Sequence, residues 1–337
     1  MRAFTCPDCR HLVTFESTHC LHSDTVLGFD WPTREIVRLW PGNACANRDL
    51  IACNGVAGPG GLCPACALTR LRPDDDDPAG LAQYRVAEAA KRRLVFELLE
   101  LGLPVRSFRD HEEGLGFDMR SSTPGPVVTG HAFGIVTIDV TEADPAYREW
   151  MRKDLGEPYR TVLGHLRHEV AHHYATVLAP EGSAGAARVV AAFGDVTADY
   201  DAAMERYYRD GPPAGWQDGY VTAYATMHPW EDWAETFAHY LHIRDVLQTT
   251  IAYGVSVSGP AVLAADAAPL YAYPAAAPDD LRSMLDTWLP LTYALNAINR
   301  SIGADDLYPF VLAPAVIDKL ALVDDLVRRV AAERPGG

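Results

Sequence analysis

Apolar residues recur at helical spacing through most of the chain after residue 80. In the segment 81–101 they fall three and four positions apart, which predicts an amphipathic helix that ends before Gly102 and Pro104. The segment 159–178 shows the same spacing, and Pro158 fits the first position of its helix. Further helices are expected over residues 142–155, 195–209, 229–247, 279–301 and 313–333.

Residues 115–140 follow a different pattern. The run from Gly134 to Val140 is rich in β-branched residues and alternates along its length, which is typical of a strand. We therefore expect strands within 115–140 and an α+β fold class, mainly helical with a small sheet.

The first 70 residues show little helical periodicity and contain all seven cysteines of the chain. Several cysteines stand in CxxC pairs, and such crowding favours thiolate metal sites over disulfides. A metal ion, more than an apolar core, would hold this region together. We therefore expect a zinc-ribbon region over 1–70, an acidic solvated linker over 71–80 and a larger domain over 81–337.

Charge and hydropathy narrow the class of protein. A formal net charge of −16 disfavours nucleic acid as a partner. The N-terminal residues lack the apolar stretch of a secretory signal, and no segment is long and apolar enough to cross a membrane. These features predict a cytoplasmic protein.

The segment His168 to His172 reads HEVAH. Two histidines four positions apart lie on one face of a helix, so both imidazoles can reach one metal ion. Glu169 stands beside the first histidine and could take a proton from a metal-activated water. This is the HExxH arrangement of zinc peptidases, with His168 and His172 as ligands and Glu169 as general base.

A second motif, HPWEDWAETFAHYLH, follows at residues 228–242. Catalytic zinc usually has three protein ligands, so an acidic residue on a separate helix would complete the set. We assign Glu231 as this third ligand, while Glu235, one turn on, could hold a ligand histidine by a hydrogen bond. The two glutamates could also exchange these roles. Nearby histidines, among them His165 and His228, are expected to support or cap rather than bind metal.

These motifs resemble those of gluzincin zinc peptidases and, more specifically, of a bacterial zinc-binding metallopeptidase family with an N-terminal zinc ribbon. The resemblance rests on CPDC, CANR, LCPAC, AAKRRLVFELLELGLP, TGHAFGIVTIDVTEAD, GEPYRTVLGHLRHEVAHHY, FGDVTADY and AYATMHPWEDWAETFAHYLH. It implies a zincin-like fold and hydrolysis of peptide bonds. It also implies that Tyr224, seven residues before Glu231, stabilises the oxyanion. By analogy with this fold, Gly134–Val140 would be an edge strand to which an extended peptide adds, although it could equally be internal.

The cysteines form two candidate zinc sites. Four thiolates without an open position suit a structural zinc, and the second set provides them as Cys45, Cys53, Cys63 and Cys66. The first set contains Cys6, Cys9 and Cys20, but Ser23 stands where the resembling family would have a fourth cysteine. Either a histidine, His22 or His19, completes this site, with Asp24 a weaker candidate, or the site is weak or empty. We favour His22.

The sequence thus predicts a zinc-dependent peptidase with one catalytic zinc and one or two structural zinc ions. Its substrate would be a peptide or protein, and the ribbon region could dock a protein partner. The alternative hypothesis is a zinc-stabilised interaction module whose HEVAH site binds metal without catalysis. Glu169 favours the enzyme, because a site that only binds metal has no need of a base beside its ligand.

Overall fold

The computed structural model describes residues 1–123, 125–154, 161–257 and 281–333. The chain divides into two compact units, one formed by Met1–Glu100 with Pro104–Glu169 and the other by Leu101–Leu103 with Val170–Gly337. The division falls inside one continuous helix, α5 (Val162–Leu178).

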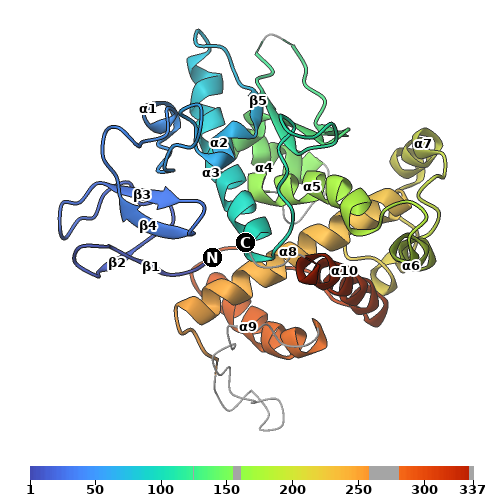
Figure 1. Ribbon diagram of the computed structural model, residues 1–337. Helices are drawn as coiled ribbons and strands as arrows, with labels where there is room; N and C mark the ends of the chain where they lie inside the picture. The colour runs from blue at the N-terminus through green and yellow to red at the C-terminus, as the bar shows by residue number, and fades with distance from the viewer. Residues whose placement is uncertain (124, 155–160, 258–280, 334–337) are drawn as a thin grey trace. The chain divides into compact units, whose positions relative to one another are not determined.

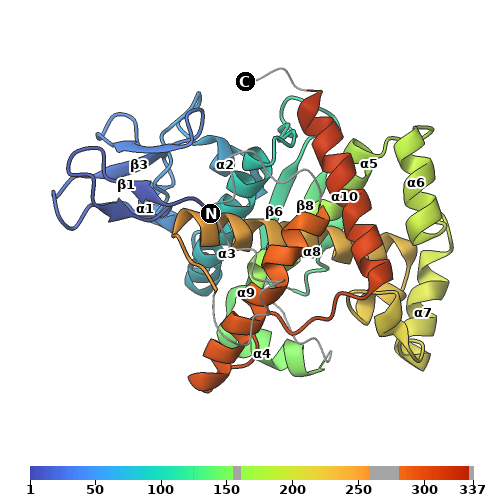
Figure 2. The ribbon, with the colours of Figure 1, turned by 90° about the horizontal axis from the view of Figure 1, so that it is seen from below.

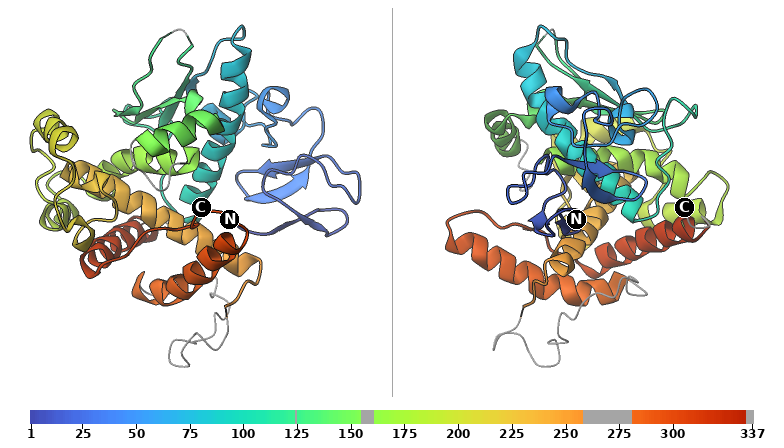
Figure 3. Two further views of the ribbon diagram at one scale, coloured as in Figure 1. Left: turned by 180° about the vertical axis from the view of Figure 1, so that it is seen from behind. Right: turned by 60° about the vertical axis from the view of Figure 1, so that its left-hand side comes forward.

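Two small hairpins and two single-turn helices make up the N-terminal part of the first unit, and Figure 3 shows them in blue. Their bounds are β1 (Phe4–Thr5), β2 (Leu12–Val13), β3 (Leu27–Asp30), β4 (Glu35–Arg38), α1 (Arg48–Ile51) and α2 (Pro64–Ala67). Strand β1 pairs antiparallel with β2, and β3 pairs antiparallel with β4. Regular secondary structure is sparse in this part of the chain.

The helix α3 (Pro78–Glu100) confirms the helix expected over 81–101 and lies beside α1 and α2 (Figure 1). An aromatic cluster joins it to the hairpins. The ring of Phe96 on α3 lies 5.1 Å from that of Phe15 and 5.7 Å from that of Phe29, measured between centroids. All three rings are buried, so the ribbon region and α3 share one core.

A four-stranded mixed sheet follows, with the order β5–β6–β8–β7. Its strands are β5 (Thr69–Leu71), β6 (Gly116–Arg120), β7 (Gly130–Ala132) and β8 (Ile135–Asp139). The strand expected over Gly134–Val140 is therefore present as β8, but it is not an edge strand, because β6 and β7 flank it. The edge strands are β5 and β7, and β7 turns back on β8 through Phe133 and Gly134, both with positive φ as in a type I′ turn.

The first unit continues with the 3₁₀ helix η1 (Val140–Ala143) and helix α4 (Pro145–Asp154). Together they account for the helix expected over 142–155, except Leu155, which lies outside the described residues. Pro158, the expected first residue of the HEVAH helix, also lies outside them. The described part of that helix begins at Val162.

The second unit is helical. Its elements are α6 (Ala184–Phe193), α7 (Tyr200–Asp210), the 3₁₀ helices η2 (Trp216–Asp218) and η3 (Tyr224–Thr226), α8 (Pro229–Ala252), α9 (Leu281–Ser301) and α10 (Pro314–Ala332). Helix α6 was not expected from the pattern. Helix α7 begins later than expected because the Asp199 carboxylate accepts a hydrogen bond from Ala202 N and caps the helix there.

Helix α8 lies at the centre of this unit and packs against η3, α6 and α10 (Figure 2). Its Trp233 and Phe237 are fully buried, and Phe237 stacks on Tyr174 of α5 with 5.8 Å between ring centroids. The indole nitrogen of Trp233 donates to the carbonyl of Ala171 on α5 at 2.9 Å. This bond and the stacked rings fix the register of α8 against the second half of α5. No helix within the described ranges is long and apolar enough to cross a membrane.

Candidate metal centres

Helix α5 carries His168 and His172 one turn apart, as the HEVAH spacing predicts. Both imidazoles are largely buried. The ring of Trp230 stacks on that of His172, with 5.2 Å between centroids and 15° between planes. Such stacking restricts the imidazole to one orientation.

Glu231 in the first turn of α8 is the carboxylate that the fold brings to these histidines. The ligand atoms of His168, His172 and Glu231 lie within 4.8 Å of one another. The Oε1 atom of Glu231 is 3.7 Å from Nε2 of His172, too far for a hydrogen bond. A tetrahedral zinc ion with ligand distances of about 2.0–2.2 Å separates its ligand atoms by about 3.4 Å, so this donor set fits zinc. Glu235 is outside the group.

The start of α8 holds Glu231 in this place. His228 caps the helix by accepting a hydrogen bond from Trp230 N at its Nδ1, 3.0 Å away. Its other ring nitrogen lies 3.0 Å from the carbonyl of Ala198 and donates to it. His228 is therefore a cap, one of the roles other than metal binding that the sequence left open for it. Glu231 is only 2% exposed, and the hydroxyl of Tyr200 donates to its Oε1 at 3.0 Å.

Glu169 lies beside His168 on α5 and contacts an imidazole that connects two carboxylates. The Nδ1 atom of His165 is 2.6 Å from Oε2 of Glu142, and its Nε2 is 3.3 Å from Oε1 of Glu169. Burial opposes protonation of His165, but the charges and hydrogen bonds of the two carboxylates outweigh it and raise its pKa to about 9. At neutral pH His165 is therefore a cation that holds the Glu169 carboxylate.

Tyr224 lies on η3, just before α8. Burial first, and then the negative charge of Glu231, raise the pKa of Tyr224 well above its ordinary value, so its phenol stays protonated. The nearby Tyr200 was not anticipated from the sequence, nor was the role of Glu142. Tyr200 belongs to the FGDVTADY motif, but nothing in its local spacing points to Glu231. Glu142 is 23 positions from His165, so only the fold reveals this pair.

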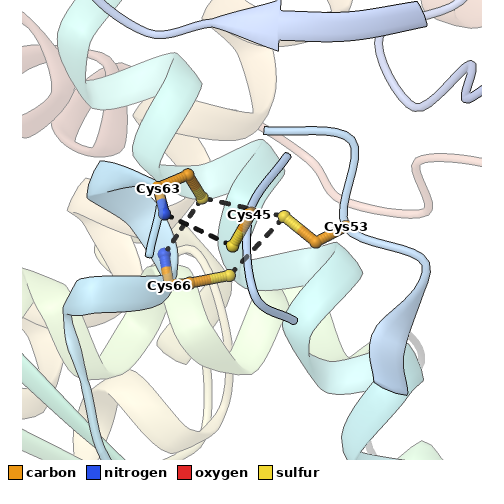
Figure 4. A group of neighbouring side chains, drawn as sticks. All are labelled: Cys45, Cys53, Cys63 and Cys66. Atoms are coloured by element: carbon orange, nitrogen blue, oxygen red, sulfur yellow. Dashed lines mark hydrogen bonds between the residues drawn. The ribbon is translucent and has the colours of Figure 1, made fainter. Parts of the chain in front are cut away.

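The second cysteine set is buried in the first unit, and Figure 4 shows its four side chains converging. The Sγ atom of Cys53 is 3.7 Å from that of Cys63 and 3.6 Å from that of Cys66. A tetrahedral zinc with Zn–S bonds of about 2.3 Å separates its sulfurs by about 3.8 Å, so the geometry fits. Backbone N–H groups of Gly55 and Cys63 donate to the sulfurs of Cys53 and Cys45, each at 3.3 Å.

The electrostatics of this set also favour a bound cation. The thiol of Cys45 opposes ionisation of Cys53, but the other thiols and the charge of Arg92 outweigh it and lower the pKa of Cys53. Hydrogen bonds with Cys45, Cys53 and Cys63, in that order, together with burial, raise the pKa of Cys66 far above its ordinary value. Four thiols this close cannot all ionise by themselves, whereas a divalent cation would stabilise all four thiolates. Arg92, from α3, is only 2% exposed.

The first cysteine set brings Cys6, Cys9 and Cys20 together. The Sγ atoms of Cys9 and Cys20 are 3.6 Å apart, again close to the edge of a zinc–thiolate tetrahedron. The hydroxyl of Ser23 lies 3.3 Å from Sγ of Cys6. His22, which we favoured as the fourth ligand, forms a separate group with Cys9 and with His11, a residue that the sequence reasoning did not single out.

Comparison with known proteins agrees with this arrangement. Residues 80–326 match the family described as "Putative zinc-binding metallo-peptidase", and residues 3–77 match a zinc-ribbon domain. The chain is 45% identical over 340 residues to uncharacterized proteins of Mycobacterium bovis and Mycobacterium tuberculosis, covering 99% of this chain and 97% of each relative. No solved structure matches it. With the HEVAH helix, the neighbouring glutamate and the N-terminal cysteine sets in place, the chain belongs to this family of zinc-binding metallopeptidases with an N-terminal zinc ribbon.

Proposed function

We propose that the protein is a zinc-dependent peptidase that hydrolyses peptide bonds with a general base. One observation carries this proposal. Two imidazoles and a buried carboxylate converge within 4.8 Å, and the same helix presents a second carboxylate, Glu169, beside them. Three donors of this kind, rather than four thiolates, are typical of catalytic zinc.

His168, His172 and Glu231 would hold the zinc ion. Bound there, zinc supplies Lewis acidity that lowers the pKa of a water molecule to roughly 7. Glu169 accepts a proton from the attacking water and passes it to the departing amine. The cationic His165 keeps the Glu169 carboxylate in place for both transfers. The protonated Tyr224 can donate a hydrogen bond to the developing oxyanion, and Glu235 is proposed to orient a ligand histidine.

The edge strand β7 offers a place for an extended substrate. In the sheet that the described residues form, no strand neighbours the outer side of β7, so a peptide can add there by backbone hydrogen bonds. His131 on β7 interacts electrostatically with Glu169. Burial of His131 lowers its pKa, although the charge of Glu169 opposes this effect. We therefore propose that β7, and not β8, aligns the scissile bond with the base.

The cysteine sets indicate where the protein works. None of the seven cysteines is in a disulfide. Thiolate zinc sites need a reducing compartment, and we propose that this is the cytoplasm. The zinc content would then be one ion at the histidine–glutamate centre and one or two in the cysteine sets.

A peptide library tests the proposed activity. The Glu169→Gln variant should keep its zinc and lose cleavage by a factor of about 10² to 10⁴, because the amide cannot accept the proton. His168→Ala should remove one zinc ion and leave those of the cysteine sets. The exposed Glu205→Gln is the matched control and should cleave like the wild type. Zinc-loaded wild type that cleaves no member of a broad library would instead favour the interaction module.

A further inference from the structure

The first cysteine set is assembled by two turns that share one backbone design. In the first turn, Cys6 N donates to the carbonyl of His11 at 2.8 Å, and Arg10 N donates to the carbonyl of Cys6 at 3.0 Å. Arg10 has a φ of 62°, in the left-handed region. This turn presents both Cys6 and Cys9 to the site, as a CxxC pair requires.

The second turn repeats this pattern fourteen positions later. Cys20 N donates to the carbonyl of Thr25 at 2.9 Å, and Asp24 N donates to the carbonyl of Cys20 at 3.0 Å. Asp24 has a φ of 59°, which matches that of the corresponding residue in the first turn. In this correspondence Ser23 stands where Cys9 stands in the first turn. The backbone for a fourth cysteine is therefore present, while the side chain is a serine.

The hydrogen bonds of Ser23 define what it offers at the fourth corner. Its Oγ lies 2.7 Å from Oγ1 of Thr25 and 3.3 Å from Sγ of Cys6. Thr25 donates its hydroxyl proton to Asp8, so the bond between the two hydroxyls needs Ser23 as its donor. The lone pairs of Ser23 are then left for the cysteine side. A neutral hydroxyl is a weaker zinc ligand than a thiolate. Only three of the four corners would therefore hold a zinc ion firmly.

A second donor set adjoins this corner. Cys9, His11 and His22 have ligand atoms within 4.8 Å of one another, so Cys9 belongs to both sets. The rings of His11 and His22 stack with 3.6 Å between centroids and 19° between planes, and both residues are exposed. Imidazoles at the protein surface can bind an ion that still has water ligands, and a shared thiolate can pass it inward.

We propose that the first cysteine set is an exchangeable zinc site, and that zinc enters and leaves it through the surface set formed by Cys9, His11 and His22. The Cys45 set differs from the first set in two ways. It has four cysteines instead of three, and all four are buried. One chain would then contain a permanent and an exchangeable zinc ion in the same ribbon region. The exchangeable site makes the ribbon responsive to the supply of zinc.

Zinc release from the full-length protein into an excess of a chromogenic chelator tests this proposal. The His172→Ala background removes the contribution of the histidine–glutamate centre. The protein should then contain two zinc ions per chain, one released fast and one slowly. Ser23→Cys should slow the fast phase by roughly tenfold or more, because a fourth thiolate closes the site. Ser23→Ala should keep both ions and release one at least as fast as its parent.

The surface histidines give the second part of the test. The double variant His11→Ala, His22→Ala should keep two zinc ions and slow the fast phase several-fold. His111→Ala, an exposed histidine outside both sets, should leave the rate unchanged. A single zinc per chain, or a fast phase that Ser23→Cys does not slow, would overturn the exchangeable site. Loss of the second zinc in the double histidine variant would make histidine a permanent ligand and overturn the proposed route. These outcomes do not depend on peptidase activity.

Discussion

The Cys45 set and the group of His168, His172 and Glu231 are both suited to one zinc ion, yet they are built differently. The four cysteines come from one short stretch, and each offers the same kind of ligand. Backbone N–H groups and the buried Arg92 surround the sulfurs. The histidine–glutamate group instead has two imidazole rings and one carboxylate, from helices far apart in the sequence.

Under the proposed function, this difference separates a stabilising site from a reactive one. A closed set of thiolates uses all of its coordination to hold the protein together. The histidine–glutamate group has three donors and no fourth protein ligand among the described residues. Around it, His165 holds the carboxylate of Glu169, and the phenol of Tyr200 donates to Glu231. We therefore expect loss of the Cys45 set to affect folding and loss of the histidine–glutamate group to affect peptide hydrolysis.

The largest effect on stability is expected for substitution of Cys63, which is fully buried in the Cys45 set. Cys63→Ser should release that zinc and unfold the ribbon region, since structural zinc contributes about 10 kcal/mol or more to small domains. Circular dichroism, thermal melting and zinc analysis would measure the loss. Cys9→Ser, at the partly exposed cysteine of the first set, is the comparison and should cost much less. A Cys63→Ser protein that melts like the wild type would contradict the structural role of the set.

An intermediate effect on the free energy of unfolding is expected for substitution of His165, and this effect depends on pH. The folded pKa of about 9 lies above the ordinary value of 6.5, so the charged form stabilises the fold fully below about pH 6.5. This contribution, on the order of 3 kcal/mol, is lost as the pH rises through 9. Denaturant unfolding of wild type and His165→Gln from pH 6 to 10 would measure it. The difference between the two proteins should shrink across this range, and a constant difference would contradict the ionic role.

The smallest effect is expected at Tyr200, whose hydroxyl donates to Glu231. Tyr200→Phe removes one hydrogen bond to a buried carboxylate and should weaken zinc binding at that centre by about tenfold. Competition with a chelator would measure the affinity. Tyr293→Phe alters an exposed phenol on α9 and is the matched control. Equal zinc affinity in both variants would show that Tyr200 does not support the ligand.

Much of the helical architecture followed from the pattern of apolar residues, because that pattern reflects which face of each helix is buried. Helices α3, α5, α8 and α10 lie where the spacing predicts them, although α8 extends to Ala252. Helix α6 was missed because its sequence is dominated by small and apolar residues without a polar face. The internal position of β8 could not be predicted, since alternation identifies a strand but does not order strands in a sheet.

The sequence alone determined the local donors: the one-turn spacing of His168 and His172, and the paired cysteines. Backbone geometry fixes such spacings wherever a helix or a tight turn forms. Only the tertiary structure grouped Glu231, and not Glu235, with His168 and His172. Both glutamates are on one face of α8, so the packing of that helix against α5, fixed in part by Trp233, makes the choice. Local spacing already put Ser23 where a fourth cysteine would stand, whereas only the fold shows that its hydroxyl lies 3.3 Å from Sγ of Cys6, because contacts between separate turns depend on packing.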